Sequence, residues 1–152
     1  MKLTFIGADH EVTGSCHCLE TEHANILVDY GMEQGLNVYE NVELPISYSE
    51  VDYVLLTHAH IDHAGLLPLL YARGFRGKVV TTVATGDLCN IMLKDSAHIQ
   101  EMEAEWKNRK ARRAGSPEVP PLYEMNDALG VLQHFETYEY DELVDLAEGV
   151  RV

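Results

Sequence analysis

Three histidines and one aspartate lie within six residues, in the segment HAHIDH at positions 58–63 that follows the apolar run YVLL. Imidazole and carboxylate groups suit Zn²⁺, with Mn²⁺ or Fe²⁺ as alternatives. In extended backbone, His58 and His60 project to the same side and can bind one cation together. Asp62 and His63 lie where the chain turns into the next helix and can reach a second cation. This spacing predicts a metal site.

The chemistry expected of two neighbouring cations is hydrolysis. They would bridge a water and lower its pKa toward neutrality, and the resulting hydroxide would attack a phosphorus or carbonyl centre. Asp62 could also help to position this nucleophile. Catalytic zinc takes about three protein ligands plus water, so two metals need more donors than this segment holds. The segment therefore predicts the start of a hydrolytic centre that other donors must complete.

Asp29 is a further candidate for this centre. It ends the apolar segment ILVD, where a carboxylate is costly unless it has partners. Hydrogen bonds from Asp29 to ligating imidazoles would use it well, whereas a turn-starting aspartate before Gly31 is the alternative. We favour the supporting role. A surface or satisfied polar role is expected for the histidines outside the motif: His10, His17, His23, His98 and His134.

The elements that must position these residues follow from the apolar pattern. Short strands are expected at residues 2–7, 15–21, 25–31, 51–57 and 78–82. Helices are expected at 64–74, 85–113 and 125–135, with Asn126 or Asp127 capping the last one. The predicted apolar side of the long helix consists of Leu88, Ile91, Met92, Ile99 and Met102.

Two further segments complete this description. A loop with three prolines is expected at residues 114–123. Residues 148–152 read as the beginning of a strand, and a strand left unpaired there would promote association.

Length and charge limit the function classes. The chain has 152 residues, 46% of them apolar, which fits one domain with one core. Its net charge of −14 excludes nucleic-acid binding through the overall field. Five of the eleven basic residues form a basic segment: Lys107, Arg109, Lys110, Arg112 and Arg113. They could bind RNA phosphates, but a solvated helix face balanced by upstream glutamates is the favoured interpretation.

The three cysteines do not suggest a disulfide framework, because their number is odd and no secretion signal is present. On a strand, Cys16 and Cys18 point to one face and His17 to the other, so we expect small buried side chains rather than metal ligands. No apolar run is long enough to cross a membrane, and the N-terminal residues lack a secretory pattern. A cytoplasmic location is therefore expected.

The segment THAHIDHAG, residues 57–65, resembles the signature of the metallo-β-lactamase superfamily. Together with FIGADHEVTGSCHCLE, ILVDYGMEQG and DSAHIQEMEAEWKNRKARRAG it resembles the β-CASP branch, and within it the bacterial and archaeal relatives of the eukaryotic cleavage-and-polyadenylation endonuclease subunit. This resemblance implies an α+β fold of the αββα sandwich type, two zinc ions and hydrolysis of RNA phosphodiesters, by endo- or exonucleolytic action. By motif, His58 and His60 would bind one zinc and Asp62 and His63 the other. Asp29 would support the site without being a main ligand.

The resemblance covers nearly the whole chain but not the later blocks of the family. A Gly-His-x-Leu-Gly-Ser type segment, the bridging aspartate, the inserted β-CASP domain and the late histidines are absent. We therefore expect residues 1–152 to be the N-terminal part of a metallo-β-lactamase domain, inactive alone and binding zinc weakly or not at all. Core surface left exposed would favour a homo-oligomer or strand exchange.

Two other functions stay open. One is a small-molecule hydrolase of the same superfamily that acts on a thioester or a lactam. The other is a non-catalytic RNA-binding or assembly module that uses the basic segment, in which case RNA binding would survive chelation and fall steeply with salt.

Overall fold

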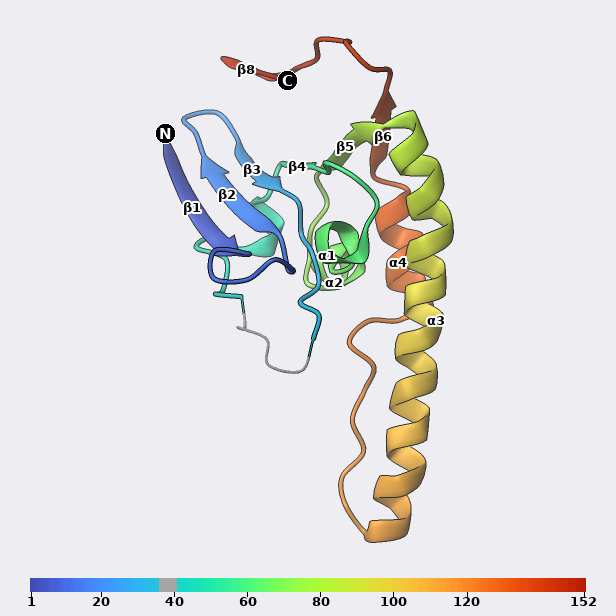
Figure 1. The fold of residues 1–152 in the computed structure, drawn as a ribbon. Helices are drawn as coiled ribbons and strands as arrows, with labels where there is room; N and C mark the ends of the chain where they lie inside the picture. Colours follow the sequence, from blue (N-terminus) through green and yellow to red (C-terminus); the bar gives the residue numbers. More distant parts are fainter. Residues whose placement is uncertain (36–40) are drawn as a thin grey trace.

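The computed structural model describes residues 1–35 and 41–152, and Figure 1 shows its elements in chain order. The strands are β1 (Lys2–Gly7), β2 (Cys16–Glu20), β3 (Asn25–Val28), β4 (Tyr53–Leu55), β5 (Lys78–Thr82), β6 (Phe135–Tyr138), β7 (Asp145–Ala147) and β8 (Val150–Arg151). The helices are η1 (Tyr48–Glu50), α1 (Ile61–Ala64), α2 (Leu67–Ala72), α3 (Val83–Ala114) and α4 (Met125–Leu132). The fold is α+β, as the sequence predicts.

A six-stranded mixed sheet in the order β1-β2-β3-β4-β5-β6 forms the centre of the molecule. The pairs β1–β2 and β2–β3 are antiparallel, and the pairs β3–β4, β4–β5 and β5–β6 are parallel. Cys18, Leu27, Val54 and Val79 lie level with one another on one face of the sheet, and none of them is exposed. They pack with apolar residues of α2, α3 and α4, so the helices cover this face.

The other face of the sheet is only partly covered by the described residues. Leu3 and Phe5 of β1 point to this face and are 53% and 58% exposed. The β7–β8 hairpin approaches it at one end, where the Tyr53 hydroxyl donates a hydrogen bond to the carbonyl oxygen of Leu146 (2.6 Å). Apolar surface of this kind fits an element that packs on the sheet.

The helix expected at residues 64–74 is two short helices. α1 begins at Ile61, directly after His60, and ends at Ala64. α2 begins at Leu67 with Pro68 in its first turn, and a proline cannot continue a helix from the residues before it. Because α1 begins at Ile61, Asp62 lies inside a helix rather than in a loop before it.

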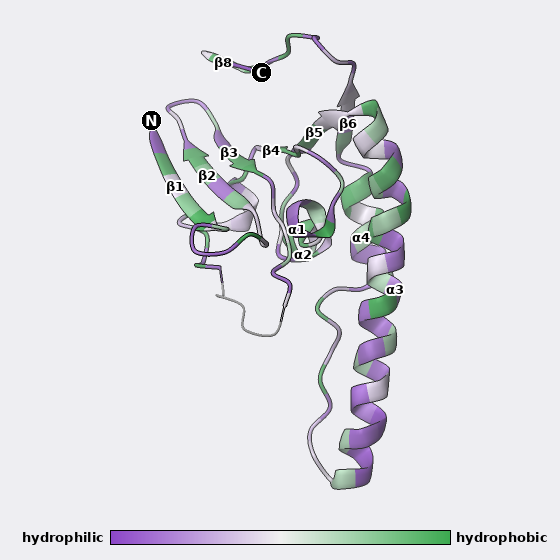
Figure 2. Cartoon of the chain, in the orientation of Figure 1, coloured by the Kyte–Doolittle hydropathy of each residue, from purple (hydrophilic) through white to green (hydrophobic). Residues whose placement is uncertain are grey.

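α3 is close to the expected length, but of the five residues predicted to form its buried side only Met92 packs against the core. Leu88, Ile91, Ile99 and Met102 are between 46% and 68% exposed. The buried residues of α3 are Thr85, Cys89, Leu93, Ala97 and Ala104. They are mostly small, and the first four of them are spaced four residues apart, so they let the helix backbone come close to the sheet and α4, while the larger side chains remain outside. Figure 2 shows that the C-terminal half of α3 is mostly hydrophilic.

The last helix and the C-terminal strands also differ from expectation. α4 ends at Leu132, and Phe135 begins β6, a strand that the sequence analysis missed. The cap of α4 is Glu124 rather than Asn126 or Asp127, and the Asp127 carboxylate accepts a hydrogen bond from the Glu124 N–H (2.9 Å). The terminal strand is paired, because β8 forms an antiparallel hairpin with β7.

Among the described residues, no helix has the length and apolar character needed to span a membrane.

The cysteines should be unreactive in the folded chain. Cys16, Cys18 and Cys89 are free thiols with no exposed surface. Burial raises the pKa of all three, that of Cys89 to about 11. At about pH 8 they should therefore be protonated thiols that iodoacetamide cannot reach. Intact mass should show no adduct on the folded chain and three on the denatured chain; an adduct formed equally fast in both would contradict this burial.

Candidate metal centre

The candidate centre lies where two parallel strands end side by side. Asp29 follows β3 directly, and Thr57 and His58 follow β4 after Leu56. The Asp29 N–H donates to the Leu55 carbonyl oxygen (3.0 Å), and the Asp29 carboxylate accepts from the Thr57 N–H (2.9 Å). Asp29 has a φ of 59°, which turns the chain out of the sheet at this point. The parallel pairing therefore brings the two predicted segments together.

The residue before β2 and the loop after β3 hold α1 in place. The N–H groups of Ser15 and Tyr30 donate to the carbonyl oxygens of Asp62 (2.8 Å) and His63 (2.9 Å). Gly31 passes so close to α1 that a Cβ atom there would lie 1.7 Å from the Asp62 carbonyl oxygen. Only glycine fits at this position without moving α1, so the loop sets the position of the motif aspartate and histidine.

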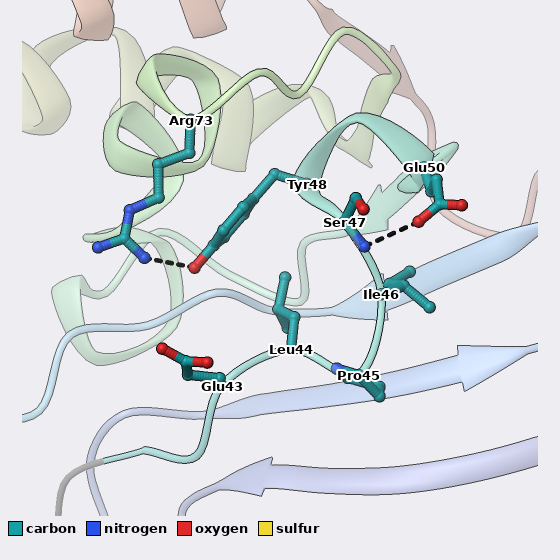
Figure 3. Close-up of a pocket in the computed structure, with 8 residues that line it drawn as sticks. All are labelled: Glu43, Leu44, Pro45, Ile46, Ser47, Tyr48, Glu50 and Arg73. Carbon is teal, nitrogen blue, oxygen red and sulfur yellow. Dashed lines mark hydrogen bonds between the residues drawn. The ribbon is translucent and has the colours of Figure 1, made fainter.

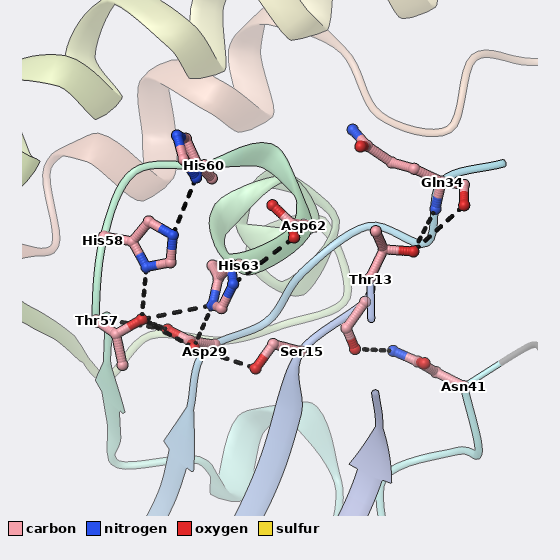
Figure 4. Close-up of polar contacts among 11 residues, drawn as sticks. Thr13, Ser15, Asp29, Gln34, Asn41, Thr57, His58, His60, Asp62 and His63 are labelled. Carbon is pink, nitrogen blue, oxygen red and sulfur yellow. Dashed lines mark hydrogen bonds and ion pairs between the residues drawn. The ribbon is translucent and has the colours of Figure 1, made fainter. Parts of the chain in front are cut away.

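The three motif histidines form an imidazole cluster, His58, His60 and His63 (Figure 4). The rings of His58 and His63 have centroids 4.0 Å apart, and those of His58 and His60 are 4.8 Å apart. His58 Nε2 lies 3.1 Å from His60 Nδ1. Two nitrogens bound to one tetrahedral zinc are about 3.3 Å apart, given Zn–N bonds of about 2.0–2.1 Å. The first two histidines therefore present a donor pair at the spacing of ligands on one ion.

Asp62 and His63 form a second donor pair. Asp62 Oδ2 and His63 Nε2 are 3.7 Å apart, and each side chain is 23% exposed. Across residues 1–35 and 41–152, no three His, Cys, Asp or Glu side chains are grouped so that they could hold an ion. The chemistry of the donors fits a divalent cation of the zinc type, with two donors available to each of two positions.

Asp29 connects the strands to the cluster. Its side chain is only 3% exposed and accepts a hydrogen bond from His63 Nδ1 (2.7 Å). It also accepts from the hydroxyls of Ser15 (3.2 Å) and Thr57 (3.0 Å) and from the Thr57 N–H. Four donors thus offset the cost of burying the carboxylate. The direct contact with His63 is the arrangement expected of a residue that orients a ligating imidazole.

Sequence reasoning missed Ser15 and Thr57, which contact this carboxylate. The available signal for Thr57 was its position between a buried strand and His58. Ser15 gave no comparable signal, because its contact depends on the antiparallel pairing of β2 with β3.

The environment of His58 keeps its ring neutral. Partial burial lowers the pKa of His58, and the neighbouring His63 and His60 lower it further. A neutral imidazole is the form that binds a metal. The two neighbouring imidazoles therefore favour the form of His58 that can act as a ligand.

The other histidines lie outside the cluster. His134 donates from Nδ1 to the Gly77 carbonyl oxygen (2.7 Å), which is the satisfied polar role expected of it. His17 packs edge-on against Phe5 on the face opposite the buried cysteines, as the strand alternation predicts. Its Nδ1 is buried without a hydrogen-bond partner among the described residues, so the surface or satisfied polar role expected of His17 was wrong.

The basic segment is partly neutralised by its neighbours. Three of its cations lie near a carboxylate: Lys107 near Glu103 (3.7 Å), Arg109 near Glu105 (3.9 Å) and Arg112 near Glu118 (2.8 Å). Lys110 lies over the Trp106 ring, 3.5 Å from its centroid. These exposed pairs add little stability, but they reduce the attraction for phosphate. RNA binding by this segment stays a prediction.

A groove of about 730 Å³ lies beside η1, lined by residues 43–48 with Glu50 and Arg73 (Figure 3). Arg73 donates to the Tyr48 hydroxyl across it, and the Ser47 N–H donates to Glu50 (2.9 Å). None of these residues belongs to the imidazole cluster. The groove is therefore separate from the candidate metal centre.

The chain is similar to known proteins in sequence and in fold. Residues 11–80 match the family model described as the metallo-beta-lactamase superfamily. In structure, the chain is similar to ST1585 of Sulfolobus tokodaii, an archaeal metallo-beta-lactamase superfamily protein, with a TM-score of 0.52 and 21% identity over 98% of this chain and 52% of that one. At this identity the similarity concerns the fold alone.

Relatives of higher identity include proteins named as ribonucleases. The chain is 36% identical to ribonuclease TTHA0252 of Thermus thermophilus, over 96% of this chain and 30% of that protein. It is 33% identical to the probable RNase MJ4 of Methanocaldococcus jannaschii (93% and 32%) and 29% identical to the transcription termination factor FttA of Thermococcus kodakarensis (100% and 23%). The chain thus spans less than a third of the length of these curated relatives.

Proposed function

Because residues 11–80 match the family model of the metallo-beta-lactamase superfamily, we propose that the chain is part of a metal-dependent ribonuclease of the β-CASP branch of this superfamily, which hydrolyses RNA phosphodiester bonds. The observation that carries this proposal is the presence of two donor pairs side by side, His58 with His60 and Asp62 with His63. Two relatives with ribonuclease names, which cover more than nine tenths of the chain, support RNA as the substrate.

The two donor pairs and Asp29 have different proposed roles. His58 and His60 would hold one cation, and Asp62 and His63 would hold the second. Asp29 orients His63 by accepting a hydrogen bond from its Nδ1–H, and this bond keeps the motif against the sheet. Zinc, or alternatively manganese or iron, would when bound supply an acidic water and offset the negative charge that develops on the phosphate oxygens. Asp62 is also placed to orient the attacking water.

The metal ligands that this chain supplies are too few for two catalytic zinc ions. Each catalytic zinc takes about three protein ligands, whereas each position here has two donors. We propose that residues 1–152 correspond to the N-terminal part of a metallo-β-lactamase domain and that the remaining ligands and the RNA-binding β-CASP domain come from further polypeptide. The length of the relatives supports this. The half-covered sheet face with Leu3 and Phe5 would pack against that polypeptide or against a second copy.

The proposal is tested on the gene product at its natural length and on residues 1–152 in parallel. Each is mixed with Zn²⁺ or Mn²⁺ and with labelled single-stranded RNA, a thioester or a lactam. We expect the full-length product to cleave RNA, chelator to abolish the cleavage, and residues 1–152 to show none, because incomplete coordination leaves the water unactivated.

The rival functions give different results in the same assay. Turnover of the thioester or lactam without RNA cleavage would identify a small-molecule hydrolase. RNA binding that survives chelation and weakens steeply with salt, without cleavage, would identify a binding module. Cleavage by residues 1–152 alone would contradict the need for further donors.

A further inference from the structure

Thr57 lies at the centre of the hydrogen bonds around the candidate metal centre. Its Oγ1 is 3.0 Å from both carboxylate oxygens of Asp29 and 3.0 Å from His58 Nδ1. It is also 3.4 Å from His63 Nδ1, but that nitrogen has a closer partner in Asp29 at 2.7 Å. The hydroxyl therefore connects a buried carboxylate to an imidazole that the carboxylate does not touch (Figure 4).

Counting protons fixes the direction of these hydrogen bonds. An ionised carboxylate only accepts, a hydroxyl has one proton to donate, and a neutral imidazole has one protonated and one unprotonated nitrogen. The Thr57 proton is donated to Asp29, so the Thr57 oxygen can only accept from His58. The contact with His58 is then a hydrogen bond only if Nδ1 of His58 carries the proton.

The proton on Nδ1 of His58 determines the state of its other ring nitrogen, Nε2. With a proton on Nδ1, the lone pair of His58 is on Nε2, and Nε2 is the atom that lies 3.1 Å from His60 Nδ1. The donor pair that faces the metal position therefore depends on a proton held on the far side of the ring. Which nitrogen of a ligating histidine is free is set by the hydrogen bond that the other nitrogen makes.

We propose that Thr57 is a positioning residue whose hydroxyl, held by Asp29, fixes His58 in the Nδ1–H tautomer and so presents Nε2 to the metal position. One carboxylate thus controls two ligands, His63 directly and His58 through Thr57. The metal-binding consequence of this inference rests on the proposed function, whereas the tautomer itself does not.

The tautomer can be observed without any metal. The ¹⁵N-labelled chain of residues 1–152 is studied by long-range ¹H–¹⁵N correlation of its imidazoles, with His58 assigned from the spectrum of His58→Gln. We expect Nδ1–H for His58 in the unmodified chain. A protonated Nε2 in the unmodified chain would overturn the proposal, whether or not any variant folds.

Substitution of Thr57 tests whether its hydroxyl sets the tautomer of His58. Thr57→Val keeps the shape and removes the hydroxyl, and it should shift His58 toward the Nε2–H tautomer. Thr57→Ser restores the hydroxyl and should restore the Nδ1–H signal. Thr137→Val makes the same change at an exposed position of β6, outside the cluster, and should leave His58 unchanged. An unchanged His58 tautomer in Thr57→Val would overturn the proposal, since water at this exposed position would then suffice.

The consequence for metal binding is measured on the gene product at natural length by Co²⁺ titration. Thr57→Val should weaken binding by about 10- to 100-fold relative to Thr57→Ser, as is usual when a hydrogen bond to a metal ligand is lost. Equal affinities in the two variants would overturn the positioning role. If the unmodified protein binds no metal and cleaves no RNA while His58 shows Nδ1–H, the proposed function fails and the tautomer control by Thr57 stands.

Discussion

His60→Ala is expected to lower metal-dependent cleavage of single-stranded RNA by at least about a thousandfold, which corresponds to about 4 kcal/mol of transition-state stabilisation. The reason is that His60 Nδ1 lies 3.1 Å from His58 Nε2 and is the second donor of that pair. Without it His58 would be a single donor at its position, too few to retain a cation at working concentrations. The measurement is the initial rate of cleavage by the gene product at natural length, with metal content determined on the same sample.

The effect should be local, because His60 is exposed and its backbone only caps α1. The thermal melting curve of His60→Ala should therefore match that of the unmodified protein. His98→Ala is the matched control: this histidine is exposed on α3 and lies outside the cluster, and its loss should change the rate by less than about twofold. A His60→Ala protein that keeps its bound metal and more than a tenth of its activity would remove His60 from the ligands.

The parts of the site that are local in sequence could be predicted, and the parts that depend on tertiary contacts could not. His58, His60, Asp62 and His63 lie within one strand-to-helix segment, so their spacing alone implies a shared direction. Ser15 is different, because a serine in a loop is common and only strand pairing brings it to the carboxylate. Hydroxyl groups that orient ligands are therefore the part of a metal site that a sequence pattern conceals.

The fold shows the same division. Strands such as β1 and β5 were predicted at their observed bounds, because their runs of apolar and β-branched residues are local signals. The orientation of α3 was not predicted, because the size of a side chain matters as much as its apolarity where helices approach closely. Ala97 and Ala104 are buried there, whereas Ile99 is 46% exposed. β6 was missed since its four residues adjoin a helix and gain their strand character by pairing with β5.

Asp29→Ala is expected to lower the free energy of unfolding by about 4 kcal/mol. Its carboxylate is buried, and its removal leaves donors of Ser15, Thr57 and His63 without their acceptor. Asp29→Asn should cost less, about 2 kcal/mol, because one amide oxygen still accepts while the amide nitrogen opposes a donor. Urea unfolding of residues 1–152, followed by far-UV circular dichroism, gives both values.

Asp141→Ala is the control that distinguishes the loss of the Asp29 hydrogen bonds from the cost of placing alanine at a positive φ. Both residues have a left-handed backbone, with φ of 59° at Asp29 and 61° at Asp141, but Asp141 is exposed. Asp141→Ala should therefore report the cost of placing alanine at positive φ, about 1 kcal/mol. The remaining loss in Asp29→Ala, about 3 kcal/mol, then belongs to the buried carboxylate and its donors. If the two alanine variants were equally stable, the carboxylate would contribute nothing to the fold and would be retained for its effect on the histidines alone.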